Sequence, residues 1–322
     1  MYFDLAVDLG SGFVSVLTRK NDIVVKQRNV VALDNSGKVL AFGNEAYALH
    51  RNGEGIKLAA PFKDCSILSK DLTEAYFRRV FNHVDERMFL SQKARILAVV
   101  NCGINTNEKR DWETVFLSTG AKQIVFVESP KACAKFLANR YSLSDCIVIN
   151  LGGTAVDFGC LADGKMTNGC SLYLAGQDID LEIKKFIEVN YNIRISVLAA
   201  EEIKRQCSLF ENDVSYITVC GVNFESGKEE TIELPARSLL DTVKSFADKY
   251  CQVVKSLLRS MDFAVADRLK LGGIYLCGGG SGLSGLKEYM SKQLNIRVAV
   301  SEGGSNTAVF GARMFLLDGI FK

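Results

Sequence analysis

The stretch Val7-Asp8-Leu9-Gly10-Ser11-Gly12-Phe13-Val14 is the most informative in the chain, because its design recurs at Ile149-Asn150-Leu151-Gly152-Gly153-Thr154-Ala155-Val156. Each copy is an apolar run that ends in Asp or Asn, followed by Leu-Gly, a short turn and a second apolar run. This pattern predicts a β-hairpin whose turn carries no bulky side chain. Two ordinary hairpins are the alternative, but the same polar position in both copies favours two related halves.

Glycine turns of this kind let backbone N–H groups approach a bound anion closely. The candidates for anion binding are Gly10, Ser11 and Gly12 in the first copy and Gly152, Gly153 and Thr154 in the second. Asp8, at the end of the first strand, is placed to hold a metal ion through water. Two such hairpins that face each other would form a phosphate clamp in a cleft between the halves.

The composition limits the classes of protein that the chain fits. With 322 residues, 48% of them hydrophobic and 24% charged, it reads as a soluble protein of about two domains. A net charge of +2 argues against a nucleic-acid partner. Ten cysteines without a CxxC pair, and only two histidines, predict a reducing compartment and no zinc site. No long apolar stretch and no secretion signal is visible, so we expect a cytoplasmic protein.

The sequence pattern predicts short strands that alternate with helices in both halves of the chain. This alternation favours an α/β fold with mostly parallel sheets covered by helices. Residues 51–70 read as irregular. The chief predicted elements are strands over 5–9, 14–18, 94–100, 124–127, 146–151 and 274–277, and helices over 44–50, 72–81, 107–118, 130–139, 178–190, 199–207, 238–260, 283–294 and 307–317.

A second group of candidates lies in the second half. The run Gly278-Gly279-Gly280-Ser281 follows a predicted strand and precedes a helix, where N–H groups and the helix dipole favour a nucleotide. Glu201 and Lys204 are three residues apart on a predicted helix and therefore share a face. They are candidates for contacting a ribose or a base, with a solvated ion pair as the alternative.

Taken together, these segments resemble the actin superfamily of ATP-binding proteins, and most closely its bacterial MreB branch. The resemblance covers nearly the whole chain and rests on five or more motifs in order. Besides the two hairpins, they are 174–180 with Gly176, 200–204, 273–281 and 306–309. The resemblance implies a duplicated actin-like (ribonuclease H-like) fold of two lobes, 1–147 and 148–322, with small subdomains at about 29–60 and 179–270 and a nucleotide cleft between the lobes.

The resemblance also implies a function. Proteins of this branch bind ATP and Mg²⁺, form head-to-tail filaments on the inner face of the cell membrane and organise cell-wall synthesis and cell shape. It therefore implies self-association, a peripheral membrane location and cell-wall synthesis proteins as partners. Beside Ala94–Val100, Met88-Phe89-Leu90 matches the place of the apolar loop that dips into the membrane in the family. Core packing under a loop is the alternative for this triplet.

Two positions depart from the family pattern. Asn150 stands where the family usually has an Asp that helps hold the metal, and an amide offers no charge to Mg²⁺. Ser129 stands where a Glu before the proline orients the attacking water, and a serine is too short and too weakly basic for that role. Glu128 is one residue away and faces the other side of a strand. Asp157 is an alternative acid, although hairpin alternation points it elsewhere.

These departures predict a protein that binds ATP but hydrolyses it slowly or not at all. Other readings remain open from the sequence alone. One is a non-hydrolysing nucleotide-binding scaffold, and another is a kinase or chaperone-type ATPase of the same superfamily. The fold by itself does not choose among them.

Overall fold

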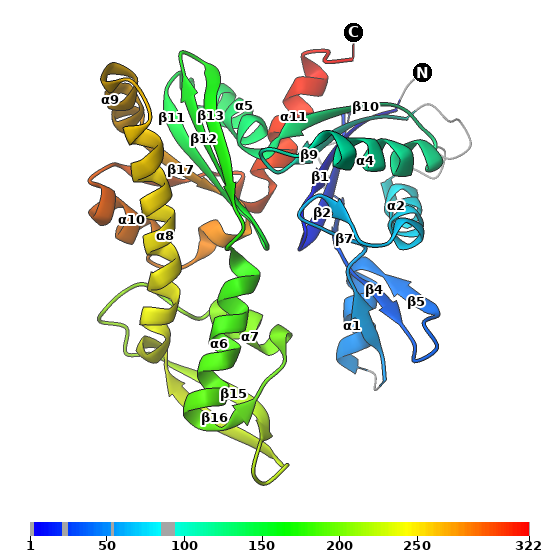
Figure 1. The fold of residues 1–322 in the computed structure, drawn as a ribbon, viewed down its shortest axis with the longest axis vertical. Helices are drawn as coiled ribbons and strands as arrows, with labels where there is room; N and C mark the ends of the chain where they lie inside the picture. Colours follow the sequence, from blue (N-terminus) through cyan, green and yellow to red (C-terminus); the bar gives the residue numbers. More distant parts are fainter. Residues whose placement is uncertain (1–2, 21–24, 53–54, 85–93, 322) are drawn as a thin grey trace. The chain divides into compact units, whose positions relative to one another are not determined.

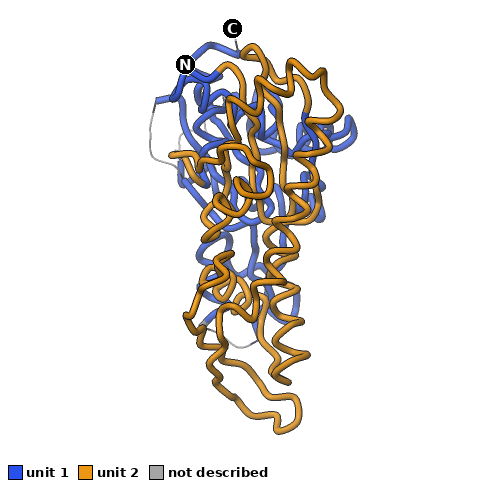
Figure 2. Tube along the Cα trace, turned by 90° about the vertical axis from the view of Figure 1, so that its left-hand side faces the viewer, with its two compact units in different colours: residues 1–143, 169–171, 305–322 blue, residues 144–168, 172–304 orange. Residues whose placement is uncertain are grey.

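The computed structural model describes residues 3–20, 25–52, 55–84 and 94–321. The chain divides into two compact units, which Figure 2 draws in different colours. Unit 1 comprises residues 1–143, 169–171 and 305–322, and unit 2 comprises residues 144–168 and 172–304. Within the described residues, no helix is both long enough and apolar enough to cross a membrane.

The centre of unit 1 is a five-stranded sheet of order β10-β9-β1-β2-β3 (Figure 1). β1 and β2 form an antiparallel hairpin, β3 continues it, and β9 and β10 lie parallel to β1 on the other side. The strands are β1 (Phe3–Leu9), β2 (Phe13–Thr18), β3 (Val25–Arg28), β9 (Ala94–Val100) and β10 (Ala121–Glu128).

Helices pack on both faces of this sheet. An aromatic core fills one face, where side chains of α2 and α4 meet Leu5, Val7 and Leu9 of β1. Successive strand residues point to opposite faces, so Ala6 and Asp8 point the other way. α11 packs against β1, β2 and β9, and α5 packs against β9 and β10. The helices are α2 (Lys70–Val84), α4 (Thr106–Ser118), α5 (Ser129–Tyr141) and α11 (Thr307–Leu317).

A smaller part of unit 1 corrects the prediction that residues 51–70 are irregular. β6 pairs with β4, and β7 and β8 form a hairpin with the two-residue turn Asp64-Cys65. Both turn residues have positive φ, which the twist of a two-residue hairpin requires. The elements are β4 (Val31–Leu33), β5 (Val39–Phe42), α1 (Gly43–Asn52), β6 (Lys57–Ala59), β7 (Phe62–Lys63) and β8 (Ser66–Ile67).

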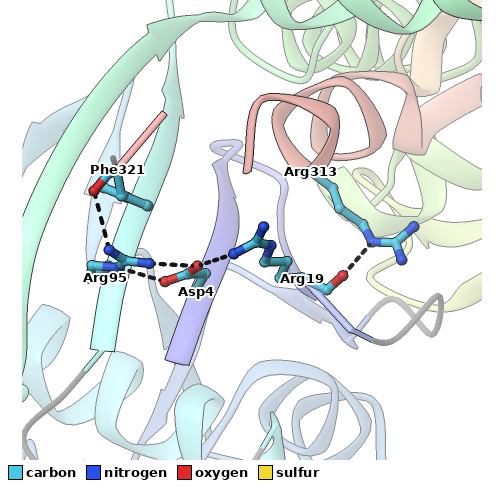
Figure 3. Close-up of polar contacts among 5 residues, drawn as sticks. All are labelled: Asp4, Arg19, Arg95, Arg313 and Phe321. Carbon is cyan, nitrogen blue, oxygen red and sulfur yellow. Dashed lines mark hydrogen bonds and ion pairs between the residues drawn. The ribbon is translucent and has the colours of Figure 1, made fainter. Parts of the chain in front are cut away.

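A buried carboxylate ties the end of the chain to β1 (Figure 3). Asp4 lies between two guanidinium groups and accepts from Arg95 Nε at 2.7 Å and from Arg19 Nη1 at 3.4 Å. Arg95 also donates to the carbonyl oxygen of Phe321 at 3.2 Å, and Arg313 donates to that of Arg19 at 3.3 Å. Because Asp4 is nearly buried, paired charges of this kind are needed to keep it there.

Unit 2 repeats the plan of unit 1. Its main sheet has the order β13-β12-β11-β17-β18, with an antiparallel hairpin of β11 and β12 and with β17 and β18 parallel to β11. The strands are β11 (Cys146–Leu151), β12 (Val156–Ala162), β13 (Lys165–Leu172), β17 (Ile274–Cys277) and β18 (Val298–Val300). The duplication predicted from the two hairpins therefore extends to whole sheets.

The remainder of unit 2 is helical with one small sheet of order β14-β15-β16. α9 packs against β11 and β12 and was missed by the sequence reading, which ended its long helix at 260. The elements are α6 (Gly176–Tyr191), β14 (Ile193–Arg194), α7 (Val197–Lys204), β15 (Tyr216–Asn223), β16 (Glu229–Pro235), the 3₁₀ helix η1 (Ala236–Leu239), α8 (Leu240–Arg259), α9 (Phe263–Gly272), the 3₁₀ helix η2 (Gly279–Gly282) and α10 (Leu286–Leu294). A third 3₁₀ helix, η3 (Gly304–Asn306), begins at the last residue of unit 2 and continues into unit 1.

The expectation of mostly parallel sheets was wrong. In both main sheets the hairpin contributes antiparallel pairs beside the parallel ones, so the sheets are mixed. The reason is local. A short glycine turn can only join antiparallel neighbours, whereas a parallel neighbour needs a long crossover such as the segment between β2 and β9.

We predict that Gly311→Ala strongly destabilises unit 1. A Cβ atom at this α11 position would lie 1.7 Å from the carbonyl oxygen of Ala132 in α5, so the two helices must move apart. The expected loss is about 3 kcal/mol of unfolding free energy. Urea unfolding followed by the fluorescence of Trp112, the single tryptophan and fully buried in unit 1, measures it.

The matched control is Gly12→Ala, because a Cβ atom there would meet no atom within 4 Å. This variant should unfold within about 0.5 kcal/mol of the unchanged protein. Equal losses for the two variants would show that the close packing of α5 and α11 does not limit stability.

Candidate functional site

The two glycine turns have the same register and the same steric requirement. Leu9 pairs with Val14 across the first turn, and Leu151 pairs with Val156 across the second. A Cβ atom on Gly10 would lie 2.5 Å from the carbonyl oxygen of the residue three further on. A Cβ atom on Gly152 would lie 2.6 Å from the carbonyl oxygen of Ala155, which is also three residues further on. Any other residue would force the turn open, so glycine is needed at both positions.

The first turn is held by a hairpin that the sequence reading missed. The Ser11 hydroxyl accepts from the backbone N–H of Asp64 at 2.9 Å. Asn29, which is buried, donates to the carbonyl oxygens of Ser11 at 3.1 Å and Phe62 at 2.7 Å. Trp112 Nε1 donates to the carbonyl of Cys65 at 2.7 Å and holds the turn from the core side. These contacts fix the backbone on which Gly10–Gly12 presents its N–H groups.

Asp8 belongs to a polar row that crosses the sheet of unit 1. It pairs with Ser15 of β2, and Ser15 pairs with Lys26 of β3, so the three side chains point to one face. Burial lowers the pKa of the Lys26 ammonium, and the negative charge of Asp8 acts in the opposite direction. Lys26 Nζ also donates to Ser305 Oγ at 2.8 Å. The carboxylate predicted to face a metal ion thus has an ammonium group in its row.

The second hairpin carries its acid on the other strand. Asn150 occupies the place of Asp8, and its cross-strand partner is Asp157. Directly paired residues of antiparallel strands point to the same side of the sheet. The expectation that Asp157 points elsewhere was therefore wrong, because alternation along one strand does not separate residues that are paired across two. Asp157 is 2% exposed and interacts with neighbouring groups.

The glycine run after β17 packs against this hairpin. A Cβ atom on Gly278 would lie 2.7 Å from Asn150 Oδ1 and 2.5 Å from the carbonyl oxygen of Leu151. Gly278 also has φ near +81°, which only glycine adopts without strain. The side chain of Asn150 is therefore held beside the Gly278 backbone, and no side chain fits between them.

The prediction that a helix begins directly after this glycine run was wrong. Gly279–Gly282 forms the short turn η2, and α10 begins only at Leu286. The Ser281 hydroxyl, which is buried, donates to the Gly278 carbonyl at 2.7 Å and stabilises that turn. The run can approach a ligand closely through its backbone, but the dipole of α10 does not begin there.

A helix N-terminus does meet the second glycine turn, on its other side. At the start of α6, the N–H of Gln177 donates to the Gly153 carbonyl at 2.6 Å, and the N–H of Gly176 donates to the Gly152 carbonyl at 3.3 Å. With these carbonyls turned toward α6, the turn Gly152–Thr154 is fixed from behind. Thr154 is itself nearly buried and interacts with neighbouring groups.

Lys204 of α7 contacts the start of α6, next to the second glycine turn. Its Nζ donates to the Gly176 carbonyl at 2.7 Å and lies 2.7 Å from Asp180 Oδ1. Asp180 is 3% exposed, and burial raises its pKa while the Lys204 charge opposes that rise. Glu201, on the same helix, forms an ion pair with Arg205. The sequence predicted that Glu201 and Lys204 share one face of a helix. It did not predict that Lys204 pairs with Asp180 of α6.

The remaining candidates are at the junction of β10 and α5. Glu128 lies beside the start of α5, and its Oε1 accepts from the N–H of Gly103 at 3.2 Å. Its neighbour Val127 is in the row of Val99 and Asp8, so Glu128 points to the opposite face from Asp8. Ser129, the first residue of α5, is 3% exposed. The triplet Met88-Phe89-Leu90 lies outside the described residues.

The comparisons with known proteins assign the family. The family model for the MreB/Mbl protein matches residues 2–319. The chain belongs to the MreB/Mbl family. The cell shape-determining protein Mbl of Bacillus subtilis (strain 168) is 27% identical over 318 residues, covering 97% of this chain and 95% of that protein. The cell shape-determining protein MreB of Escherichia coli (strain K12) is 25% identical over 308 residues, covering 93% and 89%.

Solved structures show the same fold as this family member. The crystal structure of MreB5 of Spiroplasma citri bound to AMPPNP matches with a TM-score of 0.91 and 21% identity, covering 99% of this chain and 98% of that chain. The MamK double helical filament matches with a TM-score of 0.83 and 17% identity, covering 98% and 99%. The prediction of a duplicated actin-like α/β fold is confirmed.

The polar groups of this family member fit a divalent metal ion poorly. Among the described residues, no three His, Cys, Asp or Glu side chains gather at one place. Mg²⁺ prefers carboxylate oxygens and retained waters. In unit 1 the carboxylate of Asp8 shares its row with the ammonium of Lys26, and in unit 2 the equivalent position carries the neutral Asn150. Each hairpin therefore holds one carboxylate, and the first hairpin also has a cation in the row of its carboxylate.

We predict that removing only the cation of the Lys204–Asp180 pair destabilises the protein more than removing both charges. Lys204→Met alone leaves the Asp180 carboxylate buried without its cation, and it should lower the unfolding free energy by about 3 kcal/mol. Adding Asp180→Asn removes the orphaned charge and should recover most of that loss. Differential scanning calorimetry of both variants measures the coupling.

Lys185→Met is the matched control on α6. Its ammonium lies 4.0 Å from Glu182, and both side chains are mostly exposed. Loss of such a surface pair should cost less than about 0.5 kcal/mol. If Lys204→Met behaved like this control, the pair with Asp180 would be no more than a surface contact.

Proposed function

We propose that this chain is an ATP-binding, filament-forming bacterial actin homologue of the cell-shape type that hydrolyses ATP slowly or not at all. The observation that carries the proposal is the repeated glycine hairpin, which has the same register and the same excluded Cβ position in each unit. Membership of the MreB/Mbl family supports it, as does the likeness to MreB5 structures bound to AMPPNP and to ADP.

Each unit carries its own candidate groups for binding part of a nucleotide. In unit 1 these are the backbone N–H groups of Gly10–Gly12, with Asp8 below them. In unit 2 the candidates are the N–H groups of Gly153 and Thr154, because the N–H of Gly152 already donates to the carbonyl oxygen of Ala155 at 3.0 Å. The carbonyl oxygens of Gly152 and Gly153 accept from the start of α6. Lys204 adds a positive charge at Gly176. We assign the adenosine side to Glu201 and to the backbone of Gly278–Ser281, where glycines let the backbone approach a ligand closely.

Slow hydrolysis follows from the groups at three positions. Phosphoryl transfer depends on charge neutralisation and on a positioned water. Ser129 is nearly buried at the first position of α5 and is too weakly basic to activate a water. Glu128 points to the face opposite Asp8 and accepts from Gly103. Asn150 has no charge for a metal ion, so we expect Mg²⁺ to bind weakly, through water on Asp8.

The assembly and location follow from the family. Mbl and MreB are named as cell shape-determining proteins, and a relative of the same fold forms the MamK double helical filament. We propose head-to-tail self-association, which is heterologous and therefore open-ended. We further propose a peripheral place on the inner face of the cell membrane, with Met88-Phe89-Leu90 as a contact, and cell-wall synthesis proteins as partners. A non-hydrolysing nucleotide-binding scaffold is the second candidate, and Ser129 and Asn150 favour it.

We predict that the purified protein binds ATP and pellets with it while releasing little phosphate. Changing Ser129→Glu together with Asn150→Asp should raise phosphate release by about tenfold or more, because these changes supply a base for the water and a carboxylate for the metal. Phosphate release and nucleotide binding, measured on the same samples, test this. Rapid turnover by the unchanged protein would contradict the proposal.

Glu128→Gln is the control for the double change. It keeps the size of the side chain and an oxygen that can accept from Gly103, but removes the carboxylate. We expect phosphate release to stay within about twofold of the unchanged protein. A large fall would identify Glu128 as the residue that activates water and would overturn the role given to Ser129.

Sedimentation tests the filament directly. We expect the protein to pellet at high speed with ATP or with AMPPNP, and to stay in the supernatant without nucleotide. Pelleting with AMPPNP is the informative result, because a filament whose assembly needs binding but not hydrolysis must form with both. A protein that binds ATP but never pellets would support the scaffold instead.

A further inference from the structure

Two cations lie beside the first glycine turn, on the strand next to its hairpin. Lys26 Nζ is 5.1 Å from the centre of the Phe13 ring, and Arg28 Cζ is 4.7 Å from it. Phe13 ends the Gly10–Gly12 turn, so both charges border the backbone groups that would face an anion. Lys26 and Arg28 are two residues apart on β3 and therefore lie on one face, the face of Ser15 and Asp8.

The two cations differ in how they are held. The Arg28 guanidinium is stacked between Phe13 and Tyr47, 3.8 Å from the centre of the Tyr47 ring, which fixes it in place. The Lys26 ammonium is half-buried and donates to Ser305 Oγ at 2.8 Å. Strands lie about 4.8 Å apart, so the Lys26 and Asp8 Cα atoms are roughly 10 Å apart, and a lysine side chain reaches across most of that distance.

The geometry points to Lys26 as the group that neutralises the phosphates in this protein, in the place where a divalent metal ion would otherwise act. An ammonium in the row of Asp8 repels a second cation and attracts the phosphate chain through the same charge. Asn150, in the corresponding position of unit 2, offers a metal ion no charge either. The inference rests on the proposed nucleotide binding and deepens it, because it predicts that binding needs no metal.

A purely structural role for Lys26 makes a different prediction. If the ammonium only joins β3 to Ser305, its loss lowers stability but leaves the effect of metal on binding unchanged. If the ammonium contacts phosphates, its loss changes the dependence of binding on metal. The ratio of ATP affinities with and without Mg²⁺ therefore separates the two roles, and thermal unfolding of each variant measures the structural part.

The test is the dissociation constant of ATP, measured by calorimetry in Mg²⁺ and in EDTA. We expect the unchanged protein to bind within about threefold under both conditions. Lys26→Gln should weaken binding in EDTA by about tenfold or more, equivalent to about 1.4 kcal/mol. It should recover part of that loss in Mg²⁺, because Asp8 then faces no ammonium. Lys26→Arg should keep metal-independent binding.

Lys57→Gln is the matched control, since Lys57 is an exposed lysine on β6 of the same unit. It should behave like the unchanged protein in both solutions. Binding by the unchanged protein only in Mg²⁺, or an equal ratio for Lys26→Gln, would overturn the role of Lys26 and leave nucleotide binding standing. Absence of ATP binding under both conditions would instead overturn the proposed function.

Discussion

A Cβ atom at Gly10 or Gly152 would overlap the carbonyl oxygen three residues further on, and this steric limit organises the whole molecule. It makes each hairpin turn so tight that its strands must pair in a single register. The register sets which side chains face the ligand side and which enter the core. Because both turns obey it, the two units present the same backbone to an anion, although the residues on that backbone differ.

The difference between the hairpins lies in their charge. The first carries a carboxylate at Asp8 and a lysine two strands away. The second carries an amide at Asn150 and a buried carboxylate across from it at Asp157. A fold with fixed backbone donors can tolerate such exchanges, since the N–H groups of the turns do not depend on the side chains. Such exchanges change which cation the site attracts and how fast it can hydrolyse ATP.

The two turns are supported by different kinds of contact. Lys204 and Asp180 meet behind the second turn, where the start of α6 binds the carbonyls of Gly152 and Gly153. In unit 1, the Asp64-Cys65 turn and Asn29 do the same work through neutral hydrogen bonds. A charged support is more costly to bury and more specific in direction, so the second turn should be the less tolerant of mutation.

The amino-acid sequence alone was enough to predict the two hairpins, the order of most strands and helices, and the family, because glycine turns and apolar periodicity act over a few neighbouring residues. It also identified Ser129 and Asn150 as departures from the family pattern, because a departure is recognised from the position of a residue within a motif. The folded chain was needed to establish the β7–β8 hairpin at Ser11, the later start of α10, the partner of Lys204 and the sides to which Asp157 and Lys26 point. Each of these depends on pairing between residues far apart in the chain, and register across strands cannot be read from one strand alone.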